Sequence, residues 1–186
     1  MNLFIVNDAL DVETCRSIQS AMDVGVAEPA SVLGDSVDVE VETRHATDIE
    51  VEDAVVAMVE PRLDSYRDAI GAFYGRPLQD REGCGFLRYQ AGGFYGRHVD
   101  RADLPSWPDA ARREITVVVF LNSSEDVDLP GEFGGGVLRV FPRGLDGDAV
   151  DIVPRRGLLV AFPAALPHEV TAVTRGRRDA IVDWFY

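Results

Sequence analysis

Two stretches in the first half of the chain carry apolar residues at the three- and four-residue spacing of α-helices. The first follows Asp11, a residue type that caps helix N-termini by accepting backbone N–H bonds. The second is expected to run from Asp48 to Phe73 and to be kinked or divided at Pro61, which lacks a backbone N–H. Their apolar positions are Val12, Cys15, Ile18 and Met22, and then Val51, Val55, Met58, Val59, Leu63, Tyr66, Ile70 and Phe73. One face of each helix should therefore pack against other structure.

The acidic segment between these helices, residues 23–47, is expected to be mostly irregular. Within it Val37, Val39 and Val41 alternate with acidic residues, which is the two-residue period of a half-buried strand. Such a strand, acidic on one face, is typical of a sheet edge.

After residues 75–77 the apolar period changes from helical to strand-like. Short strands separated by Gly, Pro and Asp turns are predicted at residues 85–89, 94–99, 114–121, 137–141, 149–152, 158–162, 168–173 and 179–185. This density of strands is typical of a sandwich, barrel or jelly roll rather than of alternating βαβ units. We therefore expect one α+β domain over residues 1–186, with a helical support region at 1–83 and a closed double sheet at 84–186.

Charge and composition narrow the range of partners. The 186 residues include 18 Lys and Arg against 32 Asp and Glu, a formal net charge of −14, and 46% of them are hydrophobic. That hydrophobic fraction excludes an intrinsically disordered chain. Nucleic acids and anionic membrane surfaces are disfavoured as partners, because both attract clustered Lys and Arg.

The chain also lacks the sequence signals of export. The longest apolar stretch, near residues 117–121, is far too short to span a bilayer, and the acidic N-terminus has no basic signal region. Cys15 and Cys84 are too few for a disulfide framework and have no metal-binding spacing. A cytoplasmic location is the resulting expectation.

Candidate chemistry is concentrated in the strand-rich half. His98 and Asp100 stand two residues apart on a predicted strand, so both side chains project from one face, and His168 begins another predicted strand. Two histidines and one carboxylate form the facial triad of non-haem iron(II) oxygenases. Alternatively, a His and an Asp at this spacing form a pair on the protein surface without a metal role. His45, in the acidic segment, is expected to be a solvated loop residue.

Arg178 opens the final predicted strand ten residues after His168. A guanidinium that faced the metal pocket would bind a carboxylate through two parallel hydrogen bonds, and it could hold a dicarboxylate by its far end. The alternative for Arg178 is a surface salt bridge in a very acidic protein. Arg175 and Arg177 fit that alternative better, because they flank the turn at Gly176.

Taken together, these motifs resemble the catalytic core of Fe(II)/2-oxoglutarate-dependent dioxygenases, specifically the prolyl 4-hydroxylase branch. The likeness covers residues 84–186, and residues 1–83 share only the presence of helices before the core. Its motifs are the approach at 89–98 (Tyr-Gln-Ala-Gly-Gly-Phe-Tyr-Gly-Arg-His), His98-Val99-Asp100, residues 114–122, Gly135 to Pro142, Pro167 to Val170, and Arg178 followed six residues later by Trp184. Segments 114–122, 135–142 and 167–170 are similar to the oxygen-sensing type of prolyl hydroxylase. The implied fold is a double-stranded β-helix, or jelly roll, of about eight strands.

The resemblance implies a role for each site residue and a set of cofactors. His98, Asp100 and His168 would bind Fe(II), Arg178 would pair with the distal carboxylate of 2-oxoglutarate, and Tyr89 would add a hydroxyl to that pocket. Tyr95 would line the iron pocket or the substrate groove. The other cofactors implied are O2 and, as in many relatives, ascorbate.

One position departs from the oxygen-sensing relatives. Where they have a tyrosine that also reaches the distal carboxylate, this chain has Phe120, which cannot donate that hydrogen bond. Losing a bond to a charged group costs about 1.5–3 kcal/mol, unless Thr116 or a water molecule replaces it.

The implied activity is hydroxylation of a prolyl residue in a protein or peptide, coupled to decarboxylation of 2-oxoglutarate to succinate and CO2. Two alternatives are a hydroxylase of a free amino acid or small metabolite, and a metal-binding jelly-roll module without activity. The net charge opposes a third, a nucleic-acid demethylase of the same superfamily.

Two loops and three arginines lie near the proposed site in the sequence. Residues 101–113 would form either a mobile lid or an ordinary surface loop, and residues 123–136 a flexible hairpin near the pocket mouth. Arg97, Arg101 and Arg139 are expected to form ion pairs rather than to present positive charge to a ligand.

Overall fold

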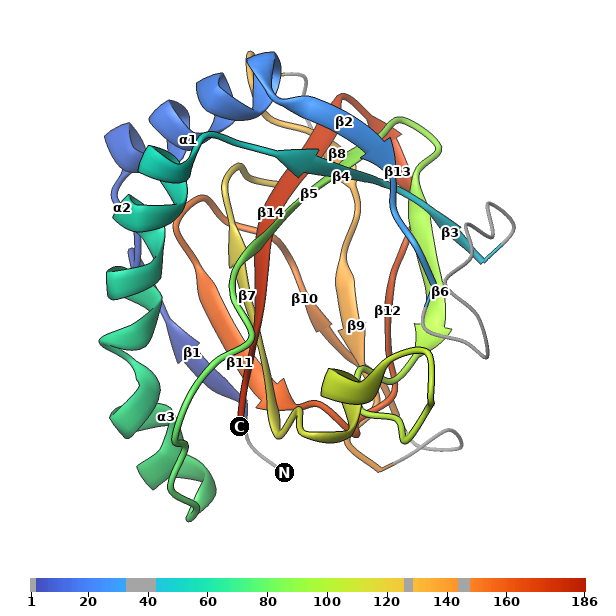
Figure 1. Cartoon of the computed structure of the whole chain (residues 1–186). Coiled ribbons are helices and arrows are strands. Elements are labelled where there is room, and N and C mark those ends of the chain that lie inside the picture. Colours follow the sequence, from blue (N-terminus) through green and yellow to red (C-terminus); the bar gives the residue numbers. More distant parts are fainter. Residues whose placement is uncertain (1–2, 33–42, 126–128, 144–147) are drawn as a thin grey trace.

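The computed structural model describes residues 3–32, 43–125, 129–143 and 148–186. Figure 1 shows these residues as helices stacked along one side of a twisted double sheet. The strand expected at Val37, Val39 and Val41 lies outside the described residues. Within the described part, no helix is long and apolar enough to cross a membrane.

Three α-helices lie before the strand-rich part of the chain. Helix α1 spans Val12–Val24, and its N-cap residue Asp11 accepts a 2.7 Å bond from the backbone N–H of Thr14, as its position predicts. Helix α2 spans Asp53–Asp64 and α3 spans Arg67–Tyr74. A short 3₁₀ helix, η1, spans Pro108–Ala111.

The expected start of the second helix at Asp48 is wrong. Asp48 lies in strand β4, Thr47–Glu50, and the helix begins only at Asp53. Residues 47–50 pair with two neighbouring strands, and this tertiary pairing overrides the weak helical spacing of the apolar residues there. Pro61 lies inside α2, and the division between α2 and α3 comes after Asp64.

The described strands form two large antiparallel sheets and one small one. The major sheet has seven strands in the order β1-β11-β7-β14-β5-β4-β2, and the minor sheet has five in the order β10-β9-β12-β6-β3. The major strands are β1 (Phe4–Val6), β11 (Leu159–Pro163), β7 (Ile115–Phe120), β14 (Arg177–Phe185), β5 (Gly85–Gln90), β4 and β2 (Val26–Pro29). The minor strands are β10 (Val150–Ile152), β9 (Leu138–Val140), β12 (His168–Val170), β6 (Phe94–His98) and β3 (Arg44–His45). Strands β13 (Val173–Arg175) and β8 (Gly134–Gly135) pair with each other.

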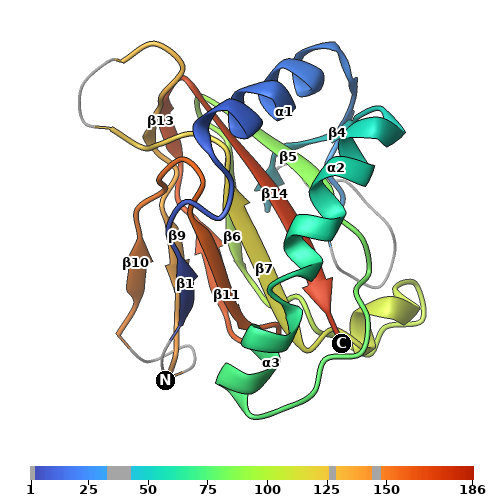
Figure 2. The same cartoon turned by 90° about the vertical axis from the view of Figure 1, so that its left-hand side faces the viewer.

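Two of the three hydrophobic clusters in the described residues illustrate how these layers pack. One cluster joins the inner faces of the three helices to the outer face of the major sheet, where Ile18, Leu63 and Ile70 meet residues such as Val117 and Ile181. Figure 2 shows α1, α2 and α3 lying along this outer face. The other cluster lies between the sheets and includes Phe120, Val140 and Phe162. The α+β jelly-roll expectation is confirmed.

Three other local expectations need correction. Within residues 23–47, the part that the structure describes contains β2 and β3, which extend the two sheets where irregular structure was expected. His45 is exposed, as expected, but it stands on β3 opposite Phe94 rather than in a loop. The strand expected at residues 168–173 divides into β12 and β13, which belong to different sheets.

Candidate metal centre and active site

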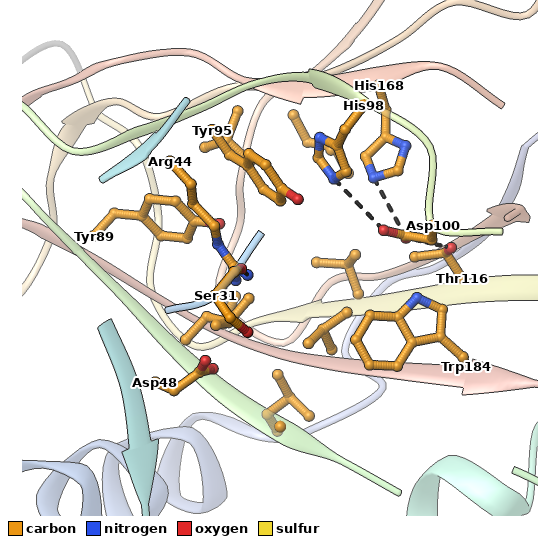
Figure 3. Close-up of a pocket in the computed structure, with 18 of the residues that line it drawn as sticks. Ser31, Arg44, Asp48, Tyr89, Tyr95, His98, Asp100, Thr116, His168 and Trp184 are labelled. Atoms are coloured by element: carbon orange, nitrogen blue, oxygen red, sulfur yellow. Dashed lines mark hydrogen bonds and ion pairs between the residues drawn. The ribbon is translucent and has the colours of Figure 1, made fainter. Parts of the chain in front are cut away.

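Strand pairing in the minor sheet brings the two histidines of the candidate triad together. His98 ends β6, His168 begins β12, and their Cα atoms are direct cross-strand partners. Asp100 follows His98 by two residues and points at both imidazoles (Figure 3). One ligand atom from each of the three side chains lies within 4.8 Å of the others. A single ion could therefore contact all three.

Backbone carbonyls orient both imidazoles. Nδ1 of His98 lies 2.8 Å from the Gly96 carbonyl oxygen, and Nδ1 of His168 lies 2.9 Å from that of Leu166. A carbonyl oxygen only accepts, so each Nδ1 carries the proton and each neutral ring leaves its Nε2 lone pair free. These Nε2 atoms lie 3.5 and 3.4 Å from the carboxylate oxygens of Asp100. This outer-shell orientation is typical of metal-ligating histidines.

The carboxylate of Asp100 is fixed from the opposite side. The buried hydroxyl of Thr116 donates a 2.7 Å hydrogen bond to Oδ2 of Asp100. Burial alone would raise the pKa of Asp100, but the adjacent imidazoles of His168 and His98 and the hydrogen bond from Thr116 hold it well below its usual range. The carboxylate is therefore ionised and ready to bind a cation.

Burial, together with the nearby imidazole of His98, lowers the pKa of His168 to about 4. His168 is therefore neutral at physiological pH, which is the state in which imidazole binds metals. Two imidazoles with free Nε2 lone pairs and one ionised carboxylate are a donor set that fits Fe(II), with coordination positions left open for other ligands.

The three side chains line a cavity of about 250 Å³ that also contains Arg178, on β14. Arg178 is only 2% exposed, and its Nε has no hydrogen-bond partner among the described residues. Its guanidinium carbon lies 5.0 Å from the ring centre of Tyr89 and 5.1 Å from that of Phe120. The surface salt bridge considered for Arg178 is therefore excluded, because the side chain is enclosed by the cavity wall.

Strand alternation separates Arg178 from its neighbour Asp179. Arg178 pairs with Tyr89 across β14 and β5 on the cavity side, whereas Asp179 pairs with Arg88 on the helix side. There Asp179 accepts hydrogen bonds of 2.7 and 3.1 Å from Arg88 and one of 3.0 Å from Gln19 of α1. The positive charge of Arg178 is thus left without an ion-pair partner in the described part of the chain.

Phe120 faces Arg178 as the sequence predicted, and Thr116 does not supply the missing donor. The Thr116 hydroxyl has one proton, and that proton is engaged by Asp100. Tyr89, 1% exposed, lies against Arg178, and Tyr95 stacks on the His98 ring with centroids 3.5 Å apart. Both tyrosines therefore line the cavity, Tyr89 at its arginine end and Tyr95 beside the histidines.

Sequence reasoning missed Arg44 and Asp48, which line the same cavity. Arg44 reaches it because β3 pairs with β6, which places Arg44 opposite Tyr95. Asp48 reaches it because β4 pairs with β5, which places Asp48 opposite Leu87. No local motif marks either residue, since their position depends on which strands become neighbours.

Trp107 and Trp184 are two further cavity residues, and Trp107 belongs to the 101–113 loop. Trp107 of this loop therefore contributes to the cavity wall. Their indole nitrogens, like the Nε atoms of Arg44 and Arg178, are buried without a hydrogen-bond partner among the described residues. Unsatisfied buried N–H groups that share one cavity indicate a ligand rich in acceptor oxygens.

The remaining arginines near the site form ion pairs, as expected. Arg97 and Arg139 both approach Glu169, at 3.6 and 3.2 Å, and Arg101 contacts Glu114 at 2.6 Å. Arg177 pairs with Asp23 of α1 at 2.7 Å. Arg175 donates a 2.9 Å bond to the carbonyl of Glu125.

Comparison with known proteins agrees with this geometry. The sequence model of the 2OG-Fe(II) oxygenase superfamily matches residues 84–186. A PKHD-type hydroxylase of Synechococcus sp. is 35% identical over 96 residues, which are 52% of this chain and 39% of that protein. One from Acidovorax ebreus is 38% identical over 102 residues, which are 53% of this chain and 40% of that protein. The matched region thus spans about two fifths of the length of these relatives.

Solved structures share the fold over nearly the whole chain. A prolyl-4-hydroxylase of Pseudomonas putida is 28% identical with a TM-score of 0.73, and the match covers 98% of this chain and 91% of that one. A Trichoplax adhaerens prolyl hydroxylase, solved with a hypoxia inducible factor peptide fragment, is 21% identical with a TM-score of 0.77, covering 99% and 83%. From the family match over more than half of its length, together with the triad and the enclosed arginine, the chain belongs to the 2OG-Fe(II) oxygenase superfamily.

Proposed function

We propose that this protein is an Fe(II)- and 2-oxoglutarate-dependent dioxygenase that hydroxylates a prolyl residue in a protein or peptide and converts 2-oxoglutarate to succinate and CO2. The observation that carries the proposal is the enclosed Arg178 in the same cavity as His98, Asp100 and His168. A metal-binding module without activity has no use for a buried, unpaired guanidinium, whereas a dicarboxylate cosubstrate needs one at its far end.

In this proposal each side chain has a defined task. Nε2 of His98, Nε2 of His168 and the carboxylate of Asp100 would hold Fe(II), which when bound supplies the activation of O2. Arg178 would bind the distal carboxylate of 2-oxoglutarate, with Tyr89 beside it. The aliphatic cavity residues would exclude water and so protect the protein from side reactions. They include Leu87, Val118, Leu138, Val170 and Val182.

Two relatives and the net charge of the chain support a prolyl substrate. The Pseudomonas putida relative is described as a prolyl-4-hydroxylase, and the Trichoplax adhaerens structure contains a peptide. The net charge of −14 opposes nucleic-acid substrates.

We also propose a cytoplasmic location, use of ascorbate to maintain Fe(II), and a single domain in which residues 1–83 support the core at 84–186.

Binding and turnover test the proposal separately. Anaerobic addition of Fe(II) and 2-oxoglutarate to the protein should produce the visible charge-transfer band of a chelated 2-oxo acid, and His98→Ala should abolish it. Arg178→Met should weaken 2-oxoglutarate binding by about tenfold or more, because a charge-assisted pair is lost. Arg177→Met is the matched control, since Arg177 pairs with Asp23 outside the cavity.

Substrate identity needs a product assay. Proline-containing peptides incubated with the loaded protein should gain about 16 Da on proline, one oxygen atom, with equal release of succinate. A mass gain on free amino acids or metabolites alone would replace the peptide substrate with a small molecule. Absence of the band, or unchanged binding in Arg178→Met, would contradict the proposed function itself.

A further inference from the structure

The cavity contains a second charged end, remote from the metal triad. In Figure 3 the carboxylate of Asp48 points into the cavity beside Ser31 and the guanidinium of Arg44, on the opposite side from Asp100. Asp48 stands on β4 of the major sheet, and Arg44 stands on β3 of the minor sheet. The two residues therefore approach the cavity from opposite sheets.

Asp48 is the carboxylate of this cavity that lacks a partner in the described part of the chain. Asp100 is held by Thr116, and Glu82 accepts two 2.6 Å bonds from Arg113. By contrast, no hydrogen bond or ion pair joins the half-buried Asp48 side chain to any described residue. Burial raises the pKa of Asp48, with Arg44 opposing that effect, so leaving this carboxylate unpaired is unfavourable.

Arg44 does not neutralise Asp48 because other groups hold its guanidinium. Its Nη1 donates a 2.6 Å bond to the carbonyl of Ser31, and the guanidinium carbon lies 4.6 Å from the ring centre of Tyr95. No ion pair within 4.0 Å joins Arg44 to Asp48, and Nε of Arg44 has no hydrogen-bond partner among the residues that the structure describes. The carboxylate of Asp48, an acceptor, and the Nε–H of Arg44, a donor, are therefore both available to a ligand at this end of the cavity.

We infer that Asp48 determines substrate specificity by binding a cationic side chain, lysine or arginine, next to the hydroxylated position of a peptide. This inference rests on the proposed function, since it assigns a substrate feature to the same site. An ionised carboxylate only accepts hydrogen bonds, and an ammonium or guanidinium group is its strongest partner. The open Nε–H of Arg44 suits a carbonyl oxygen of the same peptide.

The charge of the whole protein agrees with this assignment. A net charge of −14 attracts cationic peptides and speeds their encounter with the protein. The anionic cosubstrate, in contrast, has its own enclosed guanidinium in Arg178. The cavity thus offers different side chains to a dicarboxylate and to a cation.

Paired peptides test the inference. Each peptide contains one proline and carries, at each neighbouring position in turn, either lysine or norleucine, which has the same stem without the charge. Binding to protein loaded anaerobically with Fe(II) and 2-oxoglutarate is followed by tryptophan fluorescence, because both tryptophans of the chain line the cavity. We expect the best lysine peptide to bind about tenfold tighter than its norleucine partner.

Variants then assign the preference to one side chain. Asp48→Asn should reduce the preference for lysine to about unity. Asp48→Lys should transfer the preference to a glutamate peptide. Glu50→Gln is the matched control, because Glu50 lies on the same strand as Asp48 but is exposed and does not line the cavity, and it should keep the full preference.

Several outcomes would overturn the inference. These are equal binding of lysine and norleucine peptides to the unmodified protein, no binding of either, a preference that survives in Asp48→Asn, or tighter binding of free proline than of any lysine peptide. Failure of the proposed function is recognised independently, since it would remove the charge-transfer band before any peptide is added.

Discussion

The hydrogen bond from Thr116 to Asp100 allows a quantitative prediction about metal affinity. Thr116→Val keeps the shape of the side chain but removes the hydroxyl that lies 2.7 Å from Oδ2 of Asp100. Both residues are buried, at 1% and 7% exposure, so water cannot readily replace the lost donor. A hydrogen bond to a charged group contributes about 1.5–3 kcal/mol, which corresponds to about a 10- to 150-fold weaker Fe(II) affinity.

Calorimetric titration of metal-free protein with Fe(II) under anaerobic conditions measures this loss directly. Thr116→Ser keeps the hydroxyl and should retain most of the affinity. Val118→Ala removes bulk from the same face of β7 without touching that hydrogen bond, so it controls for packing. If Thr116→Val binds Fe(II) within about twofold of the unmodified protein, the hydroxyl does not position Asp100 and the reasoning fails.

Three further predictions concern the cosubstrate pocket and the triad. Phe120→Tyr should tighten 2-oxoglutarate binding by up to about tenfold, because it adds a hydroxyl beside Arg178. Unchanged affinity in a competition titration would show that another donor already binds that carboxylate. Gly136→Ala should raise the KM for 2-oxoglutarate, because its new methyl group would lie 3.0 Å from Cδ of Arg178. Gly131→Ala, which also has a positive φ, of 81°, but has open space around it, should leave the KM unchanged. Equal KM values for the two variants in succinate-release assays would contradict this. Metal-free protein should lose stability as the pH falls from about 6.5 to 4, because the unfolded chain takes up a proton on His168 before the folded chain, whose His168 has a pKa of about 4. The loss should approach about 3 kcal/mol in urea unfolding, and His168→Gln should flatten the profile.

Local patterns predicted those parts of the molecule whose positions depend on neighbours in sequence. The Asp11 cap and the apolar face of α1 follow from spacing alone, and so does the shared strand face of His98 and Asp100. The number and shortness of the strands indicated a sandwich, barrel or jelly roll, and the family resemblance selected the jelly roll. These features are fixed within one helix or one strand, where periodicity carries the information.

Features that depend on strand neighbours were not predictable in this way. Asp48 belongs to a strand because β2 and β5 lie beside it, although its apolar neighbours have helical spacing. Arg44 enters the cavity only through the pairing of β3 with β6. Likewise, only the structure shows that the Thr116 proton is engaged by Asp100 and is therefore not available to replace the hydroxyl missing at Phe120.

The alternation of Arg178 and Asp179 makes the charge at the Arg178 end of the cavity depend on the register of β14. Shifting β14 by one residue against β5 and β7 would carry Asp179 into the cavity and move Arg178 to the face of α1. The pocket would then repel a dicarboxylate instead of attracting it. Arg88 and Gln19 bind Asp179 on the helix side of the sheet. These contacts therefore stabilise the register that keeps Arg178, and its positive charge, in the cavity. Single-residue insertions or deletions in β14 should accordingly be far less tolerated than substitutions at its ends.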